Sequence, residues 1–185
     1  MQLQRLSSDV RRTQGDFLLV DGTPPYLPDA TPENLKYRET ILSATVNQLL
    51  GDGFSTGVSY VWDRSDLEDI FPDVPLAALS TASRKNKAVL QTVTTYLLYN
   101  HPCGFFARGH VTWYHQRNSG YNPGLPGDDF CQENIYAGYR CLNRRLELEL
   151  GLLNLSGQDC HLNPLSVYTE LPRTPTFMAR IKFLF

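Results

Sequence analysis

The chain has 185 residues, about the length of one domain. Its 17 basic and 19 acidic residues give a net charge of −2, which argues against a nucleic-acid-binding protein and against a polybasic membrane-surface protein. Hydrophobic residues make up 42% of the chain and aromatic residues 11%, so it is too apolar to be disordered. A mean hydropathy of −0.30 is too low for a bundle of membrane helices.

The longest stretch without Asp, Glu, Lys or Arg covers residues 88–107, and its 20 residues have the length of a transmembrane helix. It contains several Thr, Gln and Asn residues and is interrupted by the turn sequence His101-Pro102-Cys103-Gly104. We therefore predict two strands joined by a turn. Residues 1–15 carry charged side chains and no apolar segment, so they do not form a secretory signal peptide.

Alternation of apolar and polar residues with a period of two recurs along the chain and indicates β-strands. In the last expected strand, Phe177, Ile181 and Phe183 share one face, and Arg180 and Lys182 share the other. A soluble antiparallel sheet with one hydrated face would show the same alternation. The pattern predicts strands over residues 37–50, 54–63, 87–100, 105–116, 131–142, 145–155 and 176–185, and a further short strand over residues 15–20.

The connections between these strands alternate strictly between short turns of about two to four residues and long loops of about 14 to 23 residues. Because antiparallel strands place every second connection at the same end, one end of the sheet carries only tight turns. This asymmetry is typical of outer-membrane barrels. The expected strands of about 10 to 14 residues also suit a tilted membrane crossing, and they exceed the usual soluble strand of about 5–6 residues.

The expected fold is therefore all-β: an antiparallel up-and-down transmembrane β-barrel segment of about seven or eight strands, with short periplasmic turns and long external loops. Aromatic residues near the strand ends would form two interfacial bands. Those near the long loops are Tyr60, Trp62, Trp113 and Tyr114, and those near the short turns are Tyr99, Phe105, Phe106, Phe183 and Phe185.

The C-terminal sequence Ala179-Arg180-Ile181-Lys182-Phe183-Leu184-Phe185 alternates and ends on Phe. It resembles the terminal strand of Gram-negative outer-membrane β-barrels, whose final aromatic residue is recognised by the barrel-insertion machinery. The resemblance implies that Phe183 and Phe185 form the membrane-insertion signal. It also implies that the protein lies in the bacterial outer membrane, with outer-membrane lipid and the insertion machinery as partners.

The preceding segments narrow this resemblance. The sequences Gly151-Leu152-Leu153-Asn154-Leu155, Gln158-Asp159-Cys160 and Leu171-Pro172-Arg173-Thr174 look like the end of a TonB-dependent receptor barrel. In that family a strand ending in Asn-Leu leads into an external loop with an Asp and a Tyr, and a Gly-x-Pro-Arg-like element opens the last strand. Here Cys160 stands where the Tyr is usual, and Leu171 occupies the Gly region.

The resemblance to a barrel covers residues 36–185, and the receptor-specific part covers residues 146–185. It implies that residues 36–185 are the C-terminal portion of an outer-membrane barrel, while residues 1–35 form an N-terminal strand and external-loop region. Seven or eight strands are far fewer than the 22 of such a receptor. We therefore expect a fragment of a longer protein, in which TonB would act through a plug domain that this chain lacks.

The expected lumen face carries mixed charges, which could line a water channel, hold a plug, or pair with one another across strands. In particular, Glu147 and Glu149 lie opposite Arg180 and Lys182 on neighbouring expected strands. The lumen-lining set is Arg108, His110, Arg140, Glu147, Glu149, Arg180 and Lys182. Candidate ligand contacts in the external loops are Tyr121, Asn122, Asp128, Asp129, Asn163 and Arg173.

No arrangement of residues points to catalysis, a metal or a cofactor. The four cysteines have no Cys-x-x-Cys spacing, and the four histidines do not cluster. Cys103 and Cys141 lie at the short-turn end, and Cys131 and Cys160 at the long-loop end, so two disulfides or four free thiols are both compatible with the sequence. We expect no enzyme activity.

Three functional hypotheses remain open. The first is the C-terminal part of a TonB-dependent-receptor-like transport barrel. The second is a small or porin-like outer-membrane barrel that acts as a channel or a structural protein. The third is a soluble β-barrel that binds an apolar ligand, in which the leucines from Leu146 to Leu152 would face inward and Glu147 and Glu149 outward.

Overall fold

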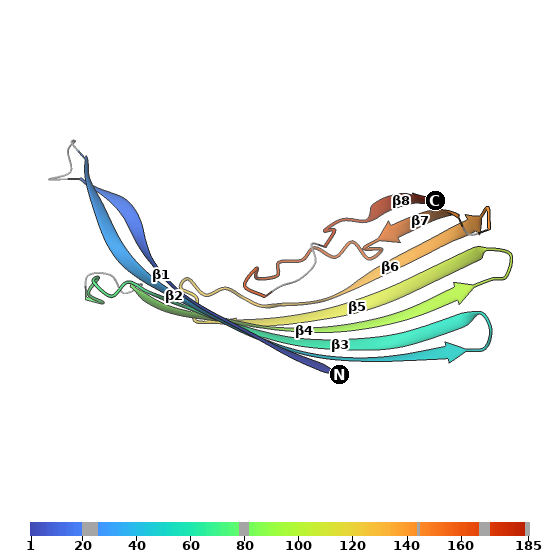
Figure 1. The fold of residues 1–185 in the computed structure, drawn as a ribbon, viewed down its shortest axis with the longest axis horizontal. Helices are drawn as coiled ribbons and strands as arrows, with labels where there is room; N and C mark the ends of the chain where they lie inside the picture. Colours follow the sequence, from blue (N-terminus) through green and yellow to red (C-terminus); the bar gives the residue numbers. More distant parts are fainter. Residues whose placement is uncertain (20–25, 78–81, 144, 167–170, 184–185) are drawn as a thin grey trace.

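In a computed structural model, the chain forms one antiparallel sheet of eight strands in the order β1-β2-β3-β4-β5-β6-β7-β8 (Figure 1). The structure describes residues 1–19, 26–77, 82–143, 145–166 and 171–183. Each strand pairs with its neighbours in sequence, so the all-β, up-and-down architecture is confirmed. The strands are β1 (Gln2–Leu19), β2 (Tyr26–Leu50), β3 (Phe54–Ile70), β4 (Ser83–Asn100), β5 (Phe105–Ser119), β6 (Asp128–Cys141), β7 (Leu146–Leu153) and β8 (Thr176–Phe183).

The predicted alternation of connection lengths is present. Short connections join β2 to β3, β4 to β5 and β6 to β7 at one end of the sheet, and longer connections join β3 to β4, β5 to β6 and β7 to β8 at the other. Several strands extend further toward the long loops than the sequence indicates. For example, β3 and β4 stay paired as far as Ile70 and Ser83, because backbone pairing continues through charged residues that do not alternate with apolar ones. The described residues contain no helix that could cross a membrane.

The N-terminal strand is longer than predicted. The sequence indicates a strand only over residues 15–20, whereas β1 (Gln2–Leu19) pairs with β2 along its entire length. Residue 20 lies outside the described residues. Polar and charged residues occupy both faces of β1, so its alternation is not visible in the sequence. The β1–β2 hairpin continues beyond the end of β3, which pairs with β2 only as far as Asn34, and Arg12 and Glu33 form an ion pair within this extension.

The strand register divides the side chains between two faces, because residues directly opposite in a sheet share a face. One face carries Val46, Val58, Thr95 and Val111 in a single row, and we call it the outer face. The other carries the neighbouring row of Thr45, Ser59, Thr94, Thr112 and Gln132, and we call it the inner face. The inner row is tied by side-chain hydrogen bonds, which join Thr45 to Ser59 and Thr94 to Thr112, each at 3.1 Å.

Burial on the two faces is the reverse of that in a soluble sheet. On the outer face, Val46 is 73% exposed, Leu150 is 55% exposed and Ile181 is 74% exposed. On the inner face, by contrast, the buried side chains are mostly polar: Thr112, Gln116, Gln132, Asn134 and Glu149. Apolar side chains usually lie inside a soluble domain and charged ones outside. The sheet therefore presents its apolar face outward and covers its polar face.

The outer face has aromatic side chains near both ends of the strands. Trp62 is eight residues after Phe54 in β3, and Trp113 is eight residues after Phe105 in β5. The Tyr99 ring lies 4.6 Å from that of Phe54 and 6.4 Å from that of Phe105. The band at the long-loop end comprises Tyr60, Trp62 and Trp113, and the band at the short-turn end comprises Phe54, Tyr99, Phe105, Tyr139 and Phe183.

Two predicted band members lie on the inner face instead. Tyr114 stacks on Phe130, with ring centroids 5.0 Å apart, and Phe106 is buried beneath the guanidinium of Arg140. Each directly follows or precedes an outer-face residue, so the alternation of the strand turns it to the opposite side. Phe185, the last predicted member, lies outside the described residues.

A glycine on the inner face makes room for one of these rings. A methyl group at Gly138 would overlap the ring of Phe106 and the carbonyl oxygen of Leu148. We therefore expect Gly138→Ala to lower the free energy of unfolding by about 1–3 kcal/mol, the usual cost of overpacking. Chemical unfolding of the purified chain measures this. The matched control is Gly124→Ala in the β5–β6 loop, where nothing lies near an added methyl group; equal stability of the two variants would contradict the prediction.

Candidate functional site

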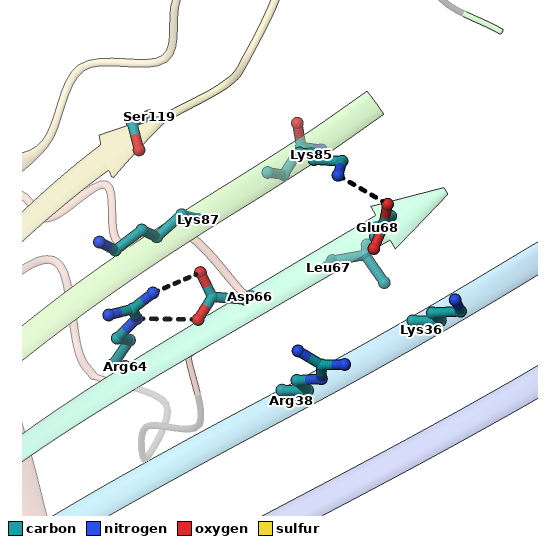
Figure 2. A pocket seen from close by; sticks show the side chains of 10 residues that line it. Lys36, Arg38, Arg64, Asp66, Leu67, Glu68, Lys85, Lys87 and Ser119 are labelled. Carbon is teal, nitrogen blue, oxygen red and sulfur yellow. Dashed lines mark hydrogen bonds and ion pairs between the residues drawn. The ribbon is translucent and has the colours of Figure 1, made fainter. Parts of the chain in front are cut away.

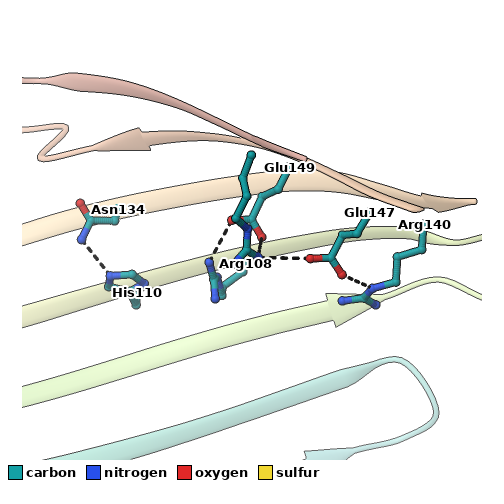
Figure 3. A network of polar contacts seen from close by, with 7 residues as sticks. Arg108, His110, Asn134, Arg140, Glu147 and Glu149 are labelled. Atoms are coloured by element: carbon teal, nitrogen blue, oxygen red, sulfur yellow. Dashed lines mark hydrogen bonds and ion pairs between the residues drawn. The ribbon is translucent and has the colours of Figure 1, made fainter. Parts of the chain in front are cut away.

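A cluster of charged side chains lies on the inner face toward the short-turn end (Figure 3). It comes from four neighbouring strands, β5 to β8, and we call it the charged cluster: Arg108, Arg140, Glu147, Glu149 and Arg180. Arg180 Nη2 lies 3.1 Å from an oxygen of Glu147 and 3.1 Å from an oxygen of Glu149. Arg108 donates to Glu149 at 3.3 Å, and Arg140 donates to Glu147 at 2.8 Å. The cluster therefore joins β8 to the rest of the sheet through side chains.

Aromatic rings support the arginines of this cluster. The guanidinium carbon of Arg108 lies 4.2 Å from the ring centroid of Tyr136, and that of Arg140 lies 4.2 Å from the ring centroid of Phe106. Such cation–π contacts contribute about 0.5–1 kcal/mol each at exposed sites. The side chain of Glu149 is 3% exposed, and a buried carboxylate needs partners of opposite charge. Arg108 and Arg180 supply them.

The other two predicted lumen residues lie beside the cluster. Lys182 is directly opposite Glu147 in the β7–β8 register, although the ion-pair partners of Glu147 are Arg140 and Arg180. One ring nitrogen of His110 lies 2.8 Å from the side-chain nitrogen of Asn134, and the imidazole stacks on Tyr136 with ring centroids 5.5 Å apart. All seven predicted lumen residues thus lie on one face of the sheet, in adjacent rows.

The connection between β7 and β8 lies along this same inner face, on the concave side of the curved sheet (Figure 1). Gln116, on β5, donates to the carbonyl oxygen of Asn163 at 3.2 Å and accepts from its backbone N–H at 2.5 Å. The side-chain amide of Asn163 donates to Tyr121 at 2.5 Å and to Asn118 at 3.2 Å. Tyr37, on β2, donates to the carbonyl oxygen of Leu165 at 3.3 Å. The loop is therefore fixed to the wall by polar contacts.

The two ends of this loop are held by further buried amides. The side chain of Asn154 donates to the carbonyl oxygens of Gln158 and Pro172, both at 2.9 Å. Gln132 also donates to Pro172, at 3.0 Å, and the backbone N–H of Asn154 donates to Asn134 at 2.7 Å. Apolar contact adds to these bonds where Cys160 and Leu162 pack against Leu90 and Phe130. This small cluster lies between the loop and the inner wall.

The predicted ligand contacts occupy two different settings. Asn163 is buried under the loop that it anchors, and Tyr121 accepts its hydrogen bond. Asp128 accepts from the backbone N–H of His161 at 2.7 Å. By contrast, Asn122, Asp129 and Arg173 are exposed: Asp129 accepts from Trp113 at 2.8 Å, and Arg173 lies 3.9 Å from Asp159. Among the six, Tyr121 and Asn163 are hydrogen-bonded to each other, and the backbone N–H of Asp129 donates to the side chain of Asp128.

The buried amides that carry the loop were not predicted from the sequence. Gln116, Gln132 and Asn154 are at most 2% exposed, yet an isolated amide in a strand, or directly after one, has no pattern of its own. The alternation of the strands could have placed Gln116 and Gln132 on the inner face beside Tyr114 and Phe130. No signal in the sequence indicated that a distant loop would pair with them.

The described residues contain no group of three or more His, Cys, Asp or Glu side chains that could hold a metal ion. All four cysteines are free thiols. Burial raises the pKa of the Cys160 thiol, so it stays protonated at neutral pH. The arrangement is suited to lining or closing a polar passage.

No protein-family model matches the chain, and no similar curated protein or solved structure was found. The geometry of the chain itself therefore carries the functional argument.

The charged cluster generates a prediction about stability. Glu149→Gln removes the carboxylate that binds Arg108 and Arg180, so we expect it to lower the free energy of unfolding by about 1.5–3 kcal/mol, the usual range for hydrogen bonds to charged groups. Asp52→Asn, in the exposed turn of residues 51–53, removes the same charge and should change stability little. A cluster that does not stabilise the wall would give two variants of equal stability.

The β7–β8 loop on the inner face generates a prediction about hydrogen exchange. Gln116→Ala leaves the backbone N–H and carbonyl of Asn163 without their partner, and we expect faster hydrogen exchange across residues 160–166. The strands themselves should exchange as slowly as before. Gln48→Ala is the control, because the exposed side chain of Gln48 bonds only to the neighbouring Leu49 carbonyl. Unchanged exchange in Gln116→Ala would show that the loop is held by other contacts.

Proposed function

We propose that this chain forms part of the wall of an outer-membrane β-barrel, and that it is the C-terminal portion of a receptor or transport barrel like those that depend on TonB. The observation that carries the proposal is the inverted burial of the two faces. A barrel wall in lipid needs an apolar exterior and a polar interior. The exposed leucines, isoleucine and valines of the outer face and the buried amides and carboxylates of the inner face meet that need.

The height of the apolar surface supports this proposal. Eight residues separate the two aromatic bands along β3 and along β5. This spacing corresponds to about 27 Å along a strand, or about 21 Å after a tilt of about 40°. The apolar band of outer-membrane barrels is about 25 Å tall and is bordered by aromatic girdles. The short turns would then lie in the periplasm, and the long loops and the extended β1–β2 hairpin outside the cell.

The inner face suits a polar passage. The charged cluster lines it near the periplasmic end, and the β7–β8 loop narrows it toward the external end. In such a barrel the wall would act as a rigid scaffold, and the exposed Asn122, Asp129 and Arg173 would be available to a ligand. Energy for transport would come from a periplasmic partner acting through a plug domain.

The edges of the sheet favour a wall segment over a complete small barrel. Within the described residues, β1 and β8 pair with β2 and β7 but not with each other. Lipid does not tolerate an open sheet edge, since each unpaired backbone group costs several kcal/mol there. Further strands beside β1 and β8 would satisfy both edges. A porin-like barrel of these eight strands alone would require β1 to pair with β8.

The soluble hypothesis has less support. It requires the leucines of β7 to face a core and Glu149 to face water. Instead Leu148, Leu150 and Leu152 are all more than 40% exposed, while Glu149 is 3% exposed. The hypothesis requires an apolar cavity for the ligand, but the covered face of the sheet carries polar side chains instead.

Arginine substitutions at two depths test the proposal. Val58 lies midway between the two bands, whereas Leu148 shares a row with Phe105 and Tyr139 in the short-turn band. In lipid we expect Val58→Arg to cost about 2–4 kcal/mol and Leu148→Arg about 0–1 kcal/mol, because the cost falls toward the interface. Unfolding from lipid vesicles measures both values.

Equal costs at the two depths would contradict the proposal. So would a wild-type chain that stays monodisperse and folded without detergent, because its exposed outer face would then tolerate water.

A further inference from the structure

A groove lined with basic side chains lies on the outer face (Figure 2). The strand register places it beyond the band of Trp62, on the long-loop side. It has a volume of about 360 Å³. Its charged residues come from three neighbouring strands, and we call it the basic groove: Lys36, Arg38, Arg64, Asp66, Glu68, Lys85 and Lys87. Its five cations outnumber its two carboxylates, and with Asp9, directly opposite Lys36 on β1, the local excess is two positive charges.

The two carboxylates of the basic groove are already paired. Arg64 donates to both oxygens of Asp66, at 2.8 Å and 3.3 Å. Lys85 lies 2.8 Å from Glu68 and lowers the pKa of that carboxyl group, so Glu68 stays ionised and bound to it. Figure 2 shows both pairs on and beside β3.

The remaining three cations flank these pairs from both sides. The register places Arg38 on β2 and Lys87 on β4 opposite Asp66, and Lys36 opposite Glu68. Within the described part of the chain, no carboxylate lies within ion-pair distance of Lys36, Arg38 or Lys87. Strands hold their side chains at fixed spacing, so these cations remain close together despite their mutual repulsion. An external anion would relieve that repulsion.

The position of the basic groove indicates what kind of anion would bind there. Arg64 lies two residues beyond Trp62 on the same face of β3, about 7 Å along the strand. Leu42 and Val89, in the rows of Trp62 and Arg64, continue the apolar surface up to the groove. A molecule with a phosphate in the groove would therefore lay an apolar chain on the outer face. Basic side chains at a membrane surface attract anionic lipid head groups in this way.

We propose that the basic groove binds the phosphate group of an anionic membrane lipid, whose acyl chains lie on the outer face below it. This inference rests on the proposed function, because it requires the outer face to contact lipid. Lys36, Arg38 and Lys87 would hold the phosphate, and the Arg64–Asp66 and Lys85–Glu68 ion pairs would form the neutral floor of the groove between them. The groove would thereby fix the depth of the wall in the outer leaflet.

Fluorescence quenching of Trp62 tests the proposal. The chain has two tryptophans, so Trp113→Phe leaves Trp62 as the sole tryptophan, two residues from the groove. The variant chain is reconstituted into phosphatidylcholine vesicles that contain either brominated phosphatidylcholine or the same amount of brominated phosphatidic acid. We expect phosphatidic acid to quench Trp62 more strongly, as a result of its enrichment at the groove.

Substitutions in the groove should abolish this preference. Arg38→Gln with Lys87→Gln should reduce the enrichment about fivefold for each cation removed. The matched control, Arg145→Gln with Arg173→Gln, removes two exposed positive charges outside the groove and should keep the preference. Equal quenching by both lipids, or a preference that survives the loss of Arg38 and Lys87, would overturn the proposal.

Three outcomes separate the alternatives. If inorganic phosphate added to the buffer removes the preference for phosphatidic acid, the groove takes free phosphate, and the assignment to a lipid is wrong. If neither brominated lipid quenches Trp62, the outer face does not contact the bilayer, and the proposed function fails with the inference. Quenching by brominated phosphatidylcholine with no added effect of phosphatidic acid leaves the proposed function intact and rejects only the lipid site.

Discussion

Everything in this structure depends on a continuous ladder of backbone hydrogen bonds that runs from β1 to β8. Between the two edge strands, the ladder satisfies the backbone without any contribution from side chains, so the two faces of the sheet are free to differ completely. One face can be apolar and exposed because no backbone group needs water there. The other can be polar and buried because its amides and carboxylates bind one another, as Gln116 binds Asn163 and Glu149 binds Arg180. A sheet of this kind is stable where its apolar face meets lipid.

The inner face has two kinds of polar contact, one near the short turns and the other toward the long loops. Near the short turns, charges on four strands pair with one another and rest on aromatic rings, so the wall is held together across its strands. Toward the long loops, neutral amides bind the backbone of a loop, and the wall holds a separate segment of chain. Charge pairs suit the first task because they act between strands at fixed spacing. Amides suit the second because each can donate and accept at the same time.

Much of the fold could be predicted from the sequence, because the alternation of apolar and polar residues indicates both where a strand lies and which face each side chain occupies. The strands from β2 to β8 were expected for this reason, and so was the pairing of Arg180 with Glu147 and Glu149. The strand predicted over residues 15–20 was much shorter than β1, because polar residues occupy both faces of β1 and only its pairing with β2 defines the strand. It also placed Asn163 among exposed contacts. The docking of a loop depends on partners far away in the chain, which no local pattern reveals.

The β7–β8 loop has a consequence for the order of assembly. It crosses the concave side of the sheet, and its buried anchors at Asn154 and Asn163 must reach β5 and β6 from that side. These anchors form together only when β5 and β6 lie side by side, because Gln116 comes from β5 and Asn134 from β6. The ordering of the loop therefore depends on the pairing of two strands that precede it in the chain.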